Sequence, residues 1–222
     1  MDTRGRKPVV AIDGPAGAGK STLARRIAEE LRLSYVNTGL MYRALARVAL
    51  REGIDVADGE GLGRRARDLS FSIGERGSQP SLTIDGSIPG PELSAADVEA
   101  VVSTVSAHPE VRAVLRAEQR RLAERGAVVE GRDIGTVVFP DADVKILLHA
   151  DPAERAARRQ AERGTRDPHL VDALARRDAL DARVNPLIPA EDATRLETTG
   201  RDADEVFAEA MTIVRRALEA MA

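Results

Sequence analysis

A glycine-rich loop near the N-terminus carries the clearest chemical signal in this chain of 222 residues. The apolar run Val9–Asp13 leads directly into the pattern G-x-x-x-x-G-K-[ST], and an amphipathic segment follows it. Such a loop turns successive backbone N–H groups toward a bound phosphate, while its lysine reaches the β and γ phosphates. The predicted phosphate-binding residues are Gly14, Pro15, Ala16, Gly17, Ala18, Gly19, Lys20, Ser21 and Thr22. The sequence therefore predicts a nucleoside triphosphate site.

The metal ion expected at this site is Mg²⁺, because a nucleoside triphosphate carries it and the Ser21 hydroxyl is placed to bind it. The chain has no cysteine, and its three histidines are scattered, so the sequence offers no zinc-type set of ligands. Thiolate chemistry and disulfides are excluded for the same reason.

Residues downstream of the loop must decide the reaction, since GTPases, motor ATPases and small-molecule kinases share this loop. The chain has no N-K-x-D segment for reading guanine, and Val128-Val129-Glu130 is a partial match to the strand of motor ATPases that ends in a carboxylate. Polar side chains instead follow two predicted strands, where open α/β sheets bind ligands. They are Thr38, Tyr42 and Arg43 after the second strand, and Arg132 and Asp133 after the third. These groups favour transfer of a phosphoryl group to a small phosphorylated acceptor.

The elements that must position these residues alternate between strand-like and helix-like patterns, as in a parallel sheet flanked by helices. The predicted strands cover residues 9–13, 34–36, 127–130, 144–149 and 194–198. The predicted helices cover residues 20–32, 40–51, 109–125, 153–163, 171–181 and 204–221. We therefore expect an α/β fold with a five-stranded parallel sheet.

Residues 53–106 interrupt this alternation. Short strand-like pieces at 70–73 and 82–84 are followed by an Asp85-Gly86 turn and by a helix from Ala95. Such an insert is too small to bury a core of its own. We expect it to pack on the parent domain as a cap over the ligand cleft.

A second unusual segment is rich in arginine on both sides of a break at residues 164–168. The basic residues are Arg155, Arg158, Arg159, Arg163, Arg166, Arg176 and Arg177. A helix–turn–helix of this kind is either a mobile lid, which brings positive charge to the substrate and excludes water, or a charged surface hairpin. Pairs such as Glu154 with Arg158 would stabilise the hairpin. Composition alone leaves both interpretations open.

Composition and charge limit the partners. The net charge of −3 argues against a nucleic-acid binder with a broadly basic surface. No apolar run approaches the ~20 residues of a membrane span. We expect one cytoplasmic domain that binds small molecules and neither nucleic acid nor membrane.

Four stretches, spread over nearly the whole chain, resemble the bacterial cytidylate kinases of the nucleoside monophosphate (NMP) kinase group. They cover residues 12–21, 38–43, 131–140 and 177–181, and the third is highly distinctive. The resemblance implies a P-loop kinase fold that transfers the γ-phosphoryl of ATP to CMP or dCMP, giving ADP and CDP or dCDP. It divides the chain into a core (8–37, 107–152 and 186–222), an NMP-binding region (38–106) and a lid (153–185). Relatives of this kind imply a monomer.

The resemblance also implies how the acceptor is held. Ser103, Arg112 and Asp133 would read cytosine, whose amine needs an acceptor and whose ring nitrogen and carbonyl need a donor. The remaining substrate contacts would be Thr38, Arg177 and Asp181 on the sugar, Arg43 and Arg132 on the acceptor phosphate, and Tyr42 beside them. The segment before Pro186 is shorter than the common pattern, so Arg183 stands in for a second phosphate-binding arginine.

The implied chemistry needs charge neutralisation rather than a general base, because the attacking phosphate oxygen of CMP is already deprotonated. The residues predicted to neutralise charge moving onto ADP are Lys20, Arg132, Arg155, Arg158 and Arg159. Asp13 either orients Mg²⁺-bound water or caps the turn.

Two other functions remain open at this point. One is a P-loop kinase for another small acceptor, such as a different NMP, shikimate or gluconate. The other is a nucleotide-dependent switch or a nucleic-acid-associated ATPase, against which the acidic balance and the scarcity of aromatic residues argue.

Overall fold

Five parallel strands form the central sheet of the computed structural model, which describes residues 7–76, 79–163, 171, 175, 178–180, 182 and 187–221. The strand order is β2-β5-β1-β6-β7. The strands are β1 (Val9–Asp13), β2 (Ser34–Asn37), β5 (Ala127–Gly131), β6 (Val144–His149) and β7 (Thr194–Glu197). All four pairings are parallel, so the five carboxyl ends meet at one edge. The predicted α/β fold is confirmed.

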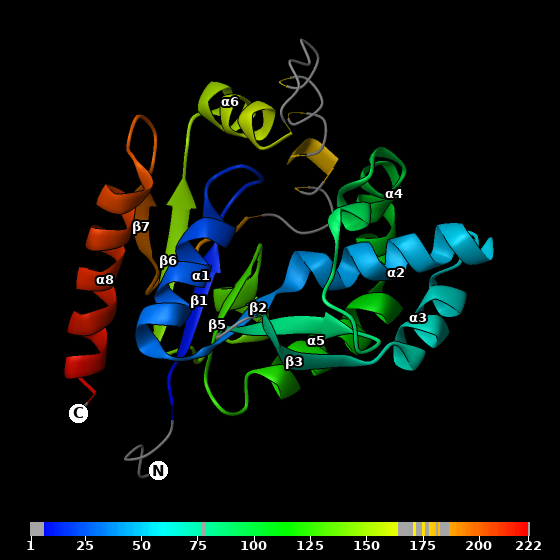
Figure 1. The fold of residues 1–222 in the computed structure, drawn as a ribbon, viewed down its shortest axis with the longest axis horizontal. Helices are drawn as coiled ribbons and strands as arrows, with labels where there is room; N and C mark the ends of the chain where they lie inside the picture. Colours follow the sequence, from blue (N-terminus) through cyan, green and yellow to red (C-terminus); the bar gives the residue numbers. More distant parts are fainter. Residues whose placement is uncertain are drawn as a thin grey trace.

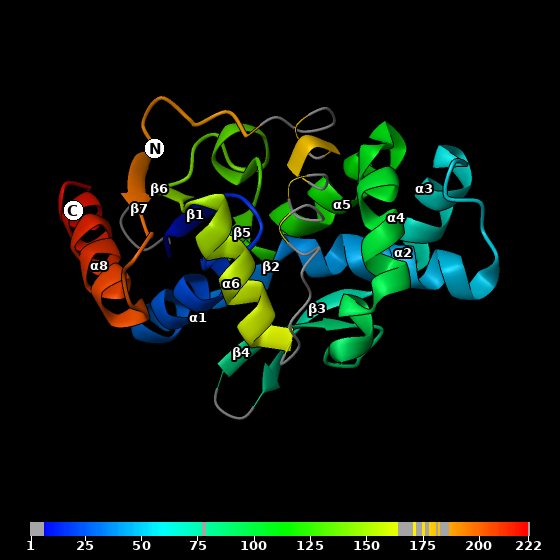
Figure 2. The same ribbon diagram turned by 90° about the horizontal axis from the view of Figure 1, so that it is seen from above.

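Helices cover both faces of this sheet (Figures 1 and 2). They are α1 (Lys20–Leu31), α2 (Thr38–Glu52), α3 (Gly59–Asp68), α4 (Ala96–Ala107), α5 (Pro109–Leu122), α6 (Pro152–Arg163) and α8 (Ala203–Glu219). In Figure 1, α6 lies beyond the carboxyl end of β6, at the edge where the strands end. None of these helices is long and apolar enough to cross a membrane.

Alternation along the central strands divides the buried side chains into two cores. Val9 and Ala11 of β1 face a core shared with α2, α4 and α5, whereas Val10 and Ile12 face one shared with α1 and α8. Successive side chains of a strand point to opposite faces, so one strand supplies both cores. β1 is therefore fixed from both sides, and the loop that follows it starts from a rigid position.

The insert packs on the first of these cores. Its hairpin consists of β3 (Phe71–Arg76) and β4 (Gln79–Ile84), and Asp85 and Gly86 turn the chain with φ of 49° and 75°. Phe71 is 2% exposed and belongs to the same buried cluster as Val36 of β2.

Several boundaries differ from the sequence-based prediction, each for a local reason. α1 ends one residue before the expected Arg32, because that residue adopts a left-handed φ of 52°. α2 begins at Thr38 rather than at residue 40, because the Asn37 side chain accepts a hydrogen bond from the Leu40 N–H. The sequence pattern did not predict α3, because its three glycines are typical of a loop. Asp58 caps this helix, and Leu62 and Ala66 lie one turn apart on its buried face. The helix expected over residues 171–181 lies mostly outside the described residues.

The shared core leads to a test of whether the insert folds with the sheet. We expect Phe71→Ala to destabilise the whole protein by about 3 to 5 kcal/mol in one cooperative transition, because it empties a site between insert and core. Urea unfolding followed by circular dichroism measures this change. The matched control is Ile88→Ala, whose side chain is 40% exposed; we expect it to change stability by less than about 0.5 kcal/mol. A separate early transition of the insert, with the main transition unmoved, would contradict a shared core.

Candidate active site

A pocket opens at the carboxyl edge of the sheet, and most of the predicted residues line it. Those lining it are Ala16, Gly17, Gly19, Lys20, Ser21, Thr22, Thr38, Tyr42, Arg43, Ser103, Arg112, Arg132, Asp133 and Arg159. They come from the glycine-rich loop, from α1, α2, α4, α5 and α6, and from the turn after β5. The structure thus brings segments more than 100 residues apart into one cavity. Arg177, Asp181 and Arg183 lie outside the described residues.

The glycine-rich loop is held tightly between β6 and α6. Gly14 and Gly17 have φ of 154° and 77°, and a Cβ at either position would lie 2.8 Å from a backbone oxygen, of Leu148 or Arg155. A side chain at these two positions is therefore excluded both by backbone conformation and by space. The conformation of this loop therefore requires glycine at both positions.

Lys20 begins α1 at the floor of this pocket. Its ammonium donates a hydrogen bond to the Pro15 carbonyl at 2.9 Å, across the loop. Burial and the nearby Arg132 guanidinium lower the pKa of Lys20 to about 7. A lysine with its charge this poorly solvated is a ready partner for an anion.

Asp13 fastens the first strand to the turn that follows β5. Its two carboxylate oxygens accept the Ile134 and Gly135 N–H groups at 2.8 Å each. Burial raises the pKa of Asp13 above its ordinary value, and these two donors offset part of that rise. The contact that Asp13 makes is therefore with the turn after β5, not with its own loop. Its part in orienting metal-bound water stays a prediction.

Asp133 and Arg112, both predicted to contact the base, already contact each other. Arg112 donates to Asp133 Oδ2 at 2.8 Å, and Arg116, which was not predicted, donates to the same oxygen at 2.8 Å. Ser103 is buried one helix away, and burial raises the pKa of Tyr42 beside this pair. The cluster offers a carboxylate acceptor and guanidinium donors side by side.

Arg43 and Thr38, both on α2, also have partners. Arg43 is 7% exposed and donates to the Leu93 carbonyl at 2.9 Å and to Glu99 at 3.0 Å. Thr38 donates to the backbone carbonyl of Glu130 at 2.7 Å. Sequence reasoning had no signal for Glu99, which lies 56 residues from its partner.

Glu130, at the end of β5, is buried next to the phosphate-binding loop. The Tyr35 hydroxyl donates to its carboxylate, and the Asn37 amide donates to the Tyr35 oxygen at 3.2 Å. Burial and the Glu130 charge raise the pKa of Tyr35 well above its ordinary range. The partial match noted at Val128-Val129-Glu130 was the available signal for this residue.

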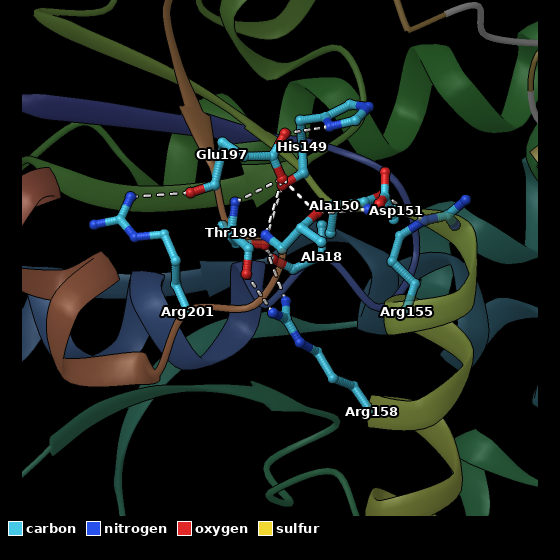
Figure 3. Close-up of polar contacts among 10 residues, drawn as sticks. Ala18, His149, Ala150, Asp151, Arg155, Arg158, Glu197, Thr198 and Arg201 are labelled. Atoms are coloured by element: carbon cyan, nitrogen blue, oxygen red, sulfur yellow. Dashed lines mark hydrogen bonds and ion pairs between the residues drawn. The ribbon is translucent and has the colours of Figure 1, made fainter.

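Three arginines of α6 were predicted to act in the site, and they have different surroundings; Figure 3 shows Arg155 and Arg158. Arg158 donates to the Thr198 hydroxyl at 2.9 Å and pairs with Glu154 at 3.2 Å, as the surface-hairpin interpretation predicted. Arg155 donates to the Ala16 carbonyl at 3.1 Å and to Asp178 at 2.6 Å. Arg159 lines the pocket, whereas Arg155 and Arg158 are held beside it.

The sequence of this chain is similar to that of proteins with known names. A sequence profile of the cytidylate kinase family matches residues 10–216. The cytidylate kinase of Streptomyces griseus is 40% identical over 96% of this chain and 95% of its own length, and that of Pelotomaculum thermopropionicum is 44% identical over 90% and 92%. A bifunctional pantoate ligase/cytidylate kinase of Synechococcus is 42% identical over 95% of this chain, which spans 43% of that longer protein.

A solved structure with a similar fold is a gluconokinase from Sinorhizobium meliloti. Its TM-score is 0.51 at 16% identity, over 97% of each chain. At this identity the likeness concerns the fold alone.

The pKa of Lys20 predicts how stability depends on pH in the absence of nucleotide. In the folded protein this lysine loses its proton near pH 7, whereas an unfolded lysine keeps it to about pH 10.4. The unfolded state binds more protons in this window, so Lys20 makes stability rise with pH, by at most about 1.4 kcal/mol per unit. We expect the unfolding free energy of the wild type to rise relative to that of Lys20→Met between pH 6.5 and pH 9.5. Urea unfolding at the two pH values measures it, and a flat or opposite trend would contradict the lowered pKa.

Proposed function

The chain belongs to the cytidylate kinase family, and we propose that it transfers the γ-phosphoryl group of ATP to CMP or dCMP, giving ADP and CDP or dCDP. The observation that carries this proposal is one pocket lined by two groups of residues of different chemistry. Lys20 and the glycine-rich loop are one group, and the Asp133–Arg112 pair is the other. The first group suits a triphosphate, and the second suits an aminopyrimidine.

Recognition of cytosine rests on the order of donors and acceptors. Asp133 accepts from the exocyclic amine, with Ser103 as a second acceptor, while Arg112 donates to the ring nitrogen and carbonyl. Uracil presents an oxygen where cytosine has the amine, so its oxygen would face a carboxylate. A buried acceptor left without its donor costs about 1 to 3 kcal/mol, which disfavours UMP.

The phosphoryl transfer rests on alignment and on positive charge. Arg43 and Arg132 hold the acceptor phosphate, while Lys20 and the loop N–H groups hold the phosphates of ATP. Because the attacking oxygen is already an anion, the protein supplies orientation and neutralisation rather than a base. Arg159 faces the pocket directly, and Arg155 and Arg158 would join it by exchanging their present partners.

The residues present also fit a Mg²⁺ ion that arrives with the nucleotide. Among the described residues no cluster of three or more histidine, aspartate or glutamate side chains forms a metal cage of its own. The Ser21 hydroxyl lines the pocket one residue after Lys20 and supplies one oxygen of the kind Mg²⁺ prefers. When bound, the ion would neutralise charge between the β and γ phosphates.

Other roles in the proposal rest on the sequence resemblance. Thr38, Arg177 and Asp181 are proposed to hold the sugar, Tyr42 to line the acceptor side, and Arg183 to contact the phosphate. A monomeric protein in the cytoplasm stays a prediction.

A panel of acceptors tests the reaction and the base preference together. With Mg²⁺ and ATP, we expect ADP release with CMP and dCMP, and a kcat/KM about 100-fold lower with UMP, because the amine contact is lost. AMP, shikimate and gluconate should give no release above background.

Lys20→Ala, which we expect to lose turnover by about 100-fold or more, controls for contaminating kinases. No release with CMP or dCMP, or a faster reaction with shikimate or gluconate, would contradict the proposed function.

A further inference from the structure

Arg116 is a residue near the Asp133–Arg112 pair that belongs to none of the sequence motifs. It lies on α5, one turn after Arg112, and does not line the pocket. Its guanidinium nevertheless donates to Asp133 Oδ2 at 2.8 Å, the same distance as Arg112. Residues four apart on a helix share one face, which explains why both reach the same carboxylate.

The two arginines occupy one oxygen of the carboxylate and leave the other. A carboxylate oxygen has two lone pairs, and here both lone pairs of Oδ2 have a guanidinium donor. Within the described part of the chain, Oδ1 has no hydrogen-bond partner. Asp133 itself lines the pocket, with a side chain 12% exposed. The two arginines thus fix the orientation of the Asp133 carboxylate, and its Oδ1 remains for a donor that binds in the pocket.

The double contact also changes what Arg112 can do. If Arg112 were the sole partner of Asp133, moving it to a ligand would leave a largely buried carboxylate without a counter-charge, which is costly. With Arg116 in place, Asp133 keeps one charge-assisted hydrogen bond while Arg112 turns to another acceptor.

We propose that Arg116 is a positioning residue for base recognition: it holds and neutralises Asp133 so that Arg112 is released to the base of the acceptor nucleotide. This inference rests on the proposed function, since it assigns Asp133 and Arg112 to cytosine. Arg116 acts through Asp133 and touches neither the base nor the phosphates.

The geometry of Arg116 does not suggest a residue selected for stability alone. Its Nε is buried and lacks a hydrogen-bond partner among the described residues, an arrangement that costs free energy. Arg120, one turn further along α5, instead donates through Nε and Nη2 to the Val138 and Val137 carbonyls at 2.9 and 3.0 Å. Arg120 therefore fastens the backbone of the neighbouring turn and is a matched control on the same helix.

The experiment compares Arg116→Met, Arg116→Lys and Arg120→Met with wild type, using CMP and UMP as acceptors at saturating ATP. For Arg116→Met we expect the KM for CMP to rise about tenfold and the preference for CMP over UMP to fall about tenfold, from the loss of one charge-assisted hydrogen bond. Its kcat and its KM for ATP should stay within about twofold, because Arg116 hydrogen-bonds to Asp133, which is assigned to the base and not to the phosphates. Arg116→Lys should recover part of the loss, since it keeps a charged donor.

The control separates positioning from stability. Arg120→Met should lower the melting temperature while leaving the KM for CMP and the base preference at their wild-type values. Should Arg116→Met fold poorly, Arg116→Lys and the CMP-induced shift in melting temperature provide the same comparison.

The inference is overturned if Arg116→Met keeps the wild-type KM and base preference, or if Arg120→Met changes both equally. A wild-type protein that converts CMP in either case leaves the proposed function standing. A wild-type protein that converts no CMP overturns the proposed function and this inference together.

Discussion

Buried guanidinium groups need carboxylate partners, and this requirement ties the parts of the site to one another. An arginine cannot lose its proton in a protein, so burial without a counter-charge is expensive. Ion pairs around the pocket include Arg43 with Glu99, Arg112 and Arg116 with Asp133, and Arg155 with Asp178. Each pair joins two different segments: α2 to α4, α5 to the turn after β5, and α6 to the segment around residue 178. The arginines suited to bind a nucleotide are thus also the residues whose ion pairs connect the segments around the pocket.

This double use explains why the pocket can be rich in arginine and still fold. On the proposed function, a phosphate would bring the negative charge that a carboxylate now supplies, so binding would exchange one partner for another rather than bury a new charge. Lys20 is the exception: its present partner is a neutral carbonyl, and its pKa is lowered to about 7. Asp13 fixes the position of the glycine-rich loop relative to Arg132 and Asp133, because it joins the end of β1 to the turn that carries them.

Sequence patterns predicted what depends on local chemistry. The loop from Gly14 to Thr22 could be predicted because a phosphate-binding turn requires glycines and a lysine at fixed spacing. The strands could be predicted from their apolar runs. Pairings set by the fold could not be predicted: Arg43 meets Glu99 across 56 residues, and neither residue carries a local signal for the other. The role of Arg116 could have been predicted, because it lies four residues after Arg112 on a predicted helix. α3 was missed because its glycines resemble a loop, although a cap and two apolar residues were present.

We expect the CMP phosphate to replace Glu99 as the partner of Arg43, and a crystal structure of the complex with CMP would show this exchange. In that complex the Arg43 guanidinium should leave Glu99 and contact the CMP phosphate, while Arg116 stays on Asp133. An Arg43–Glu99 pair that remains intact, with the phosphate bound elsewhere in the pocket, would contradict it.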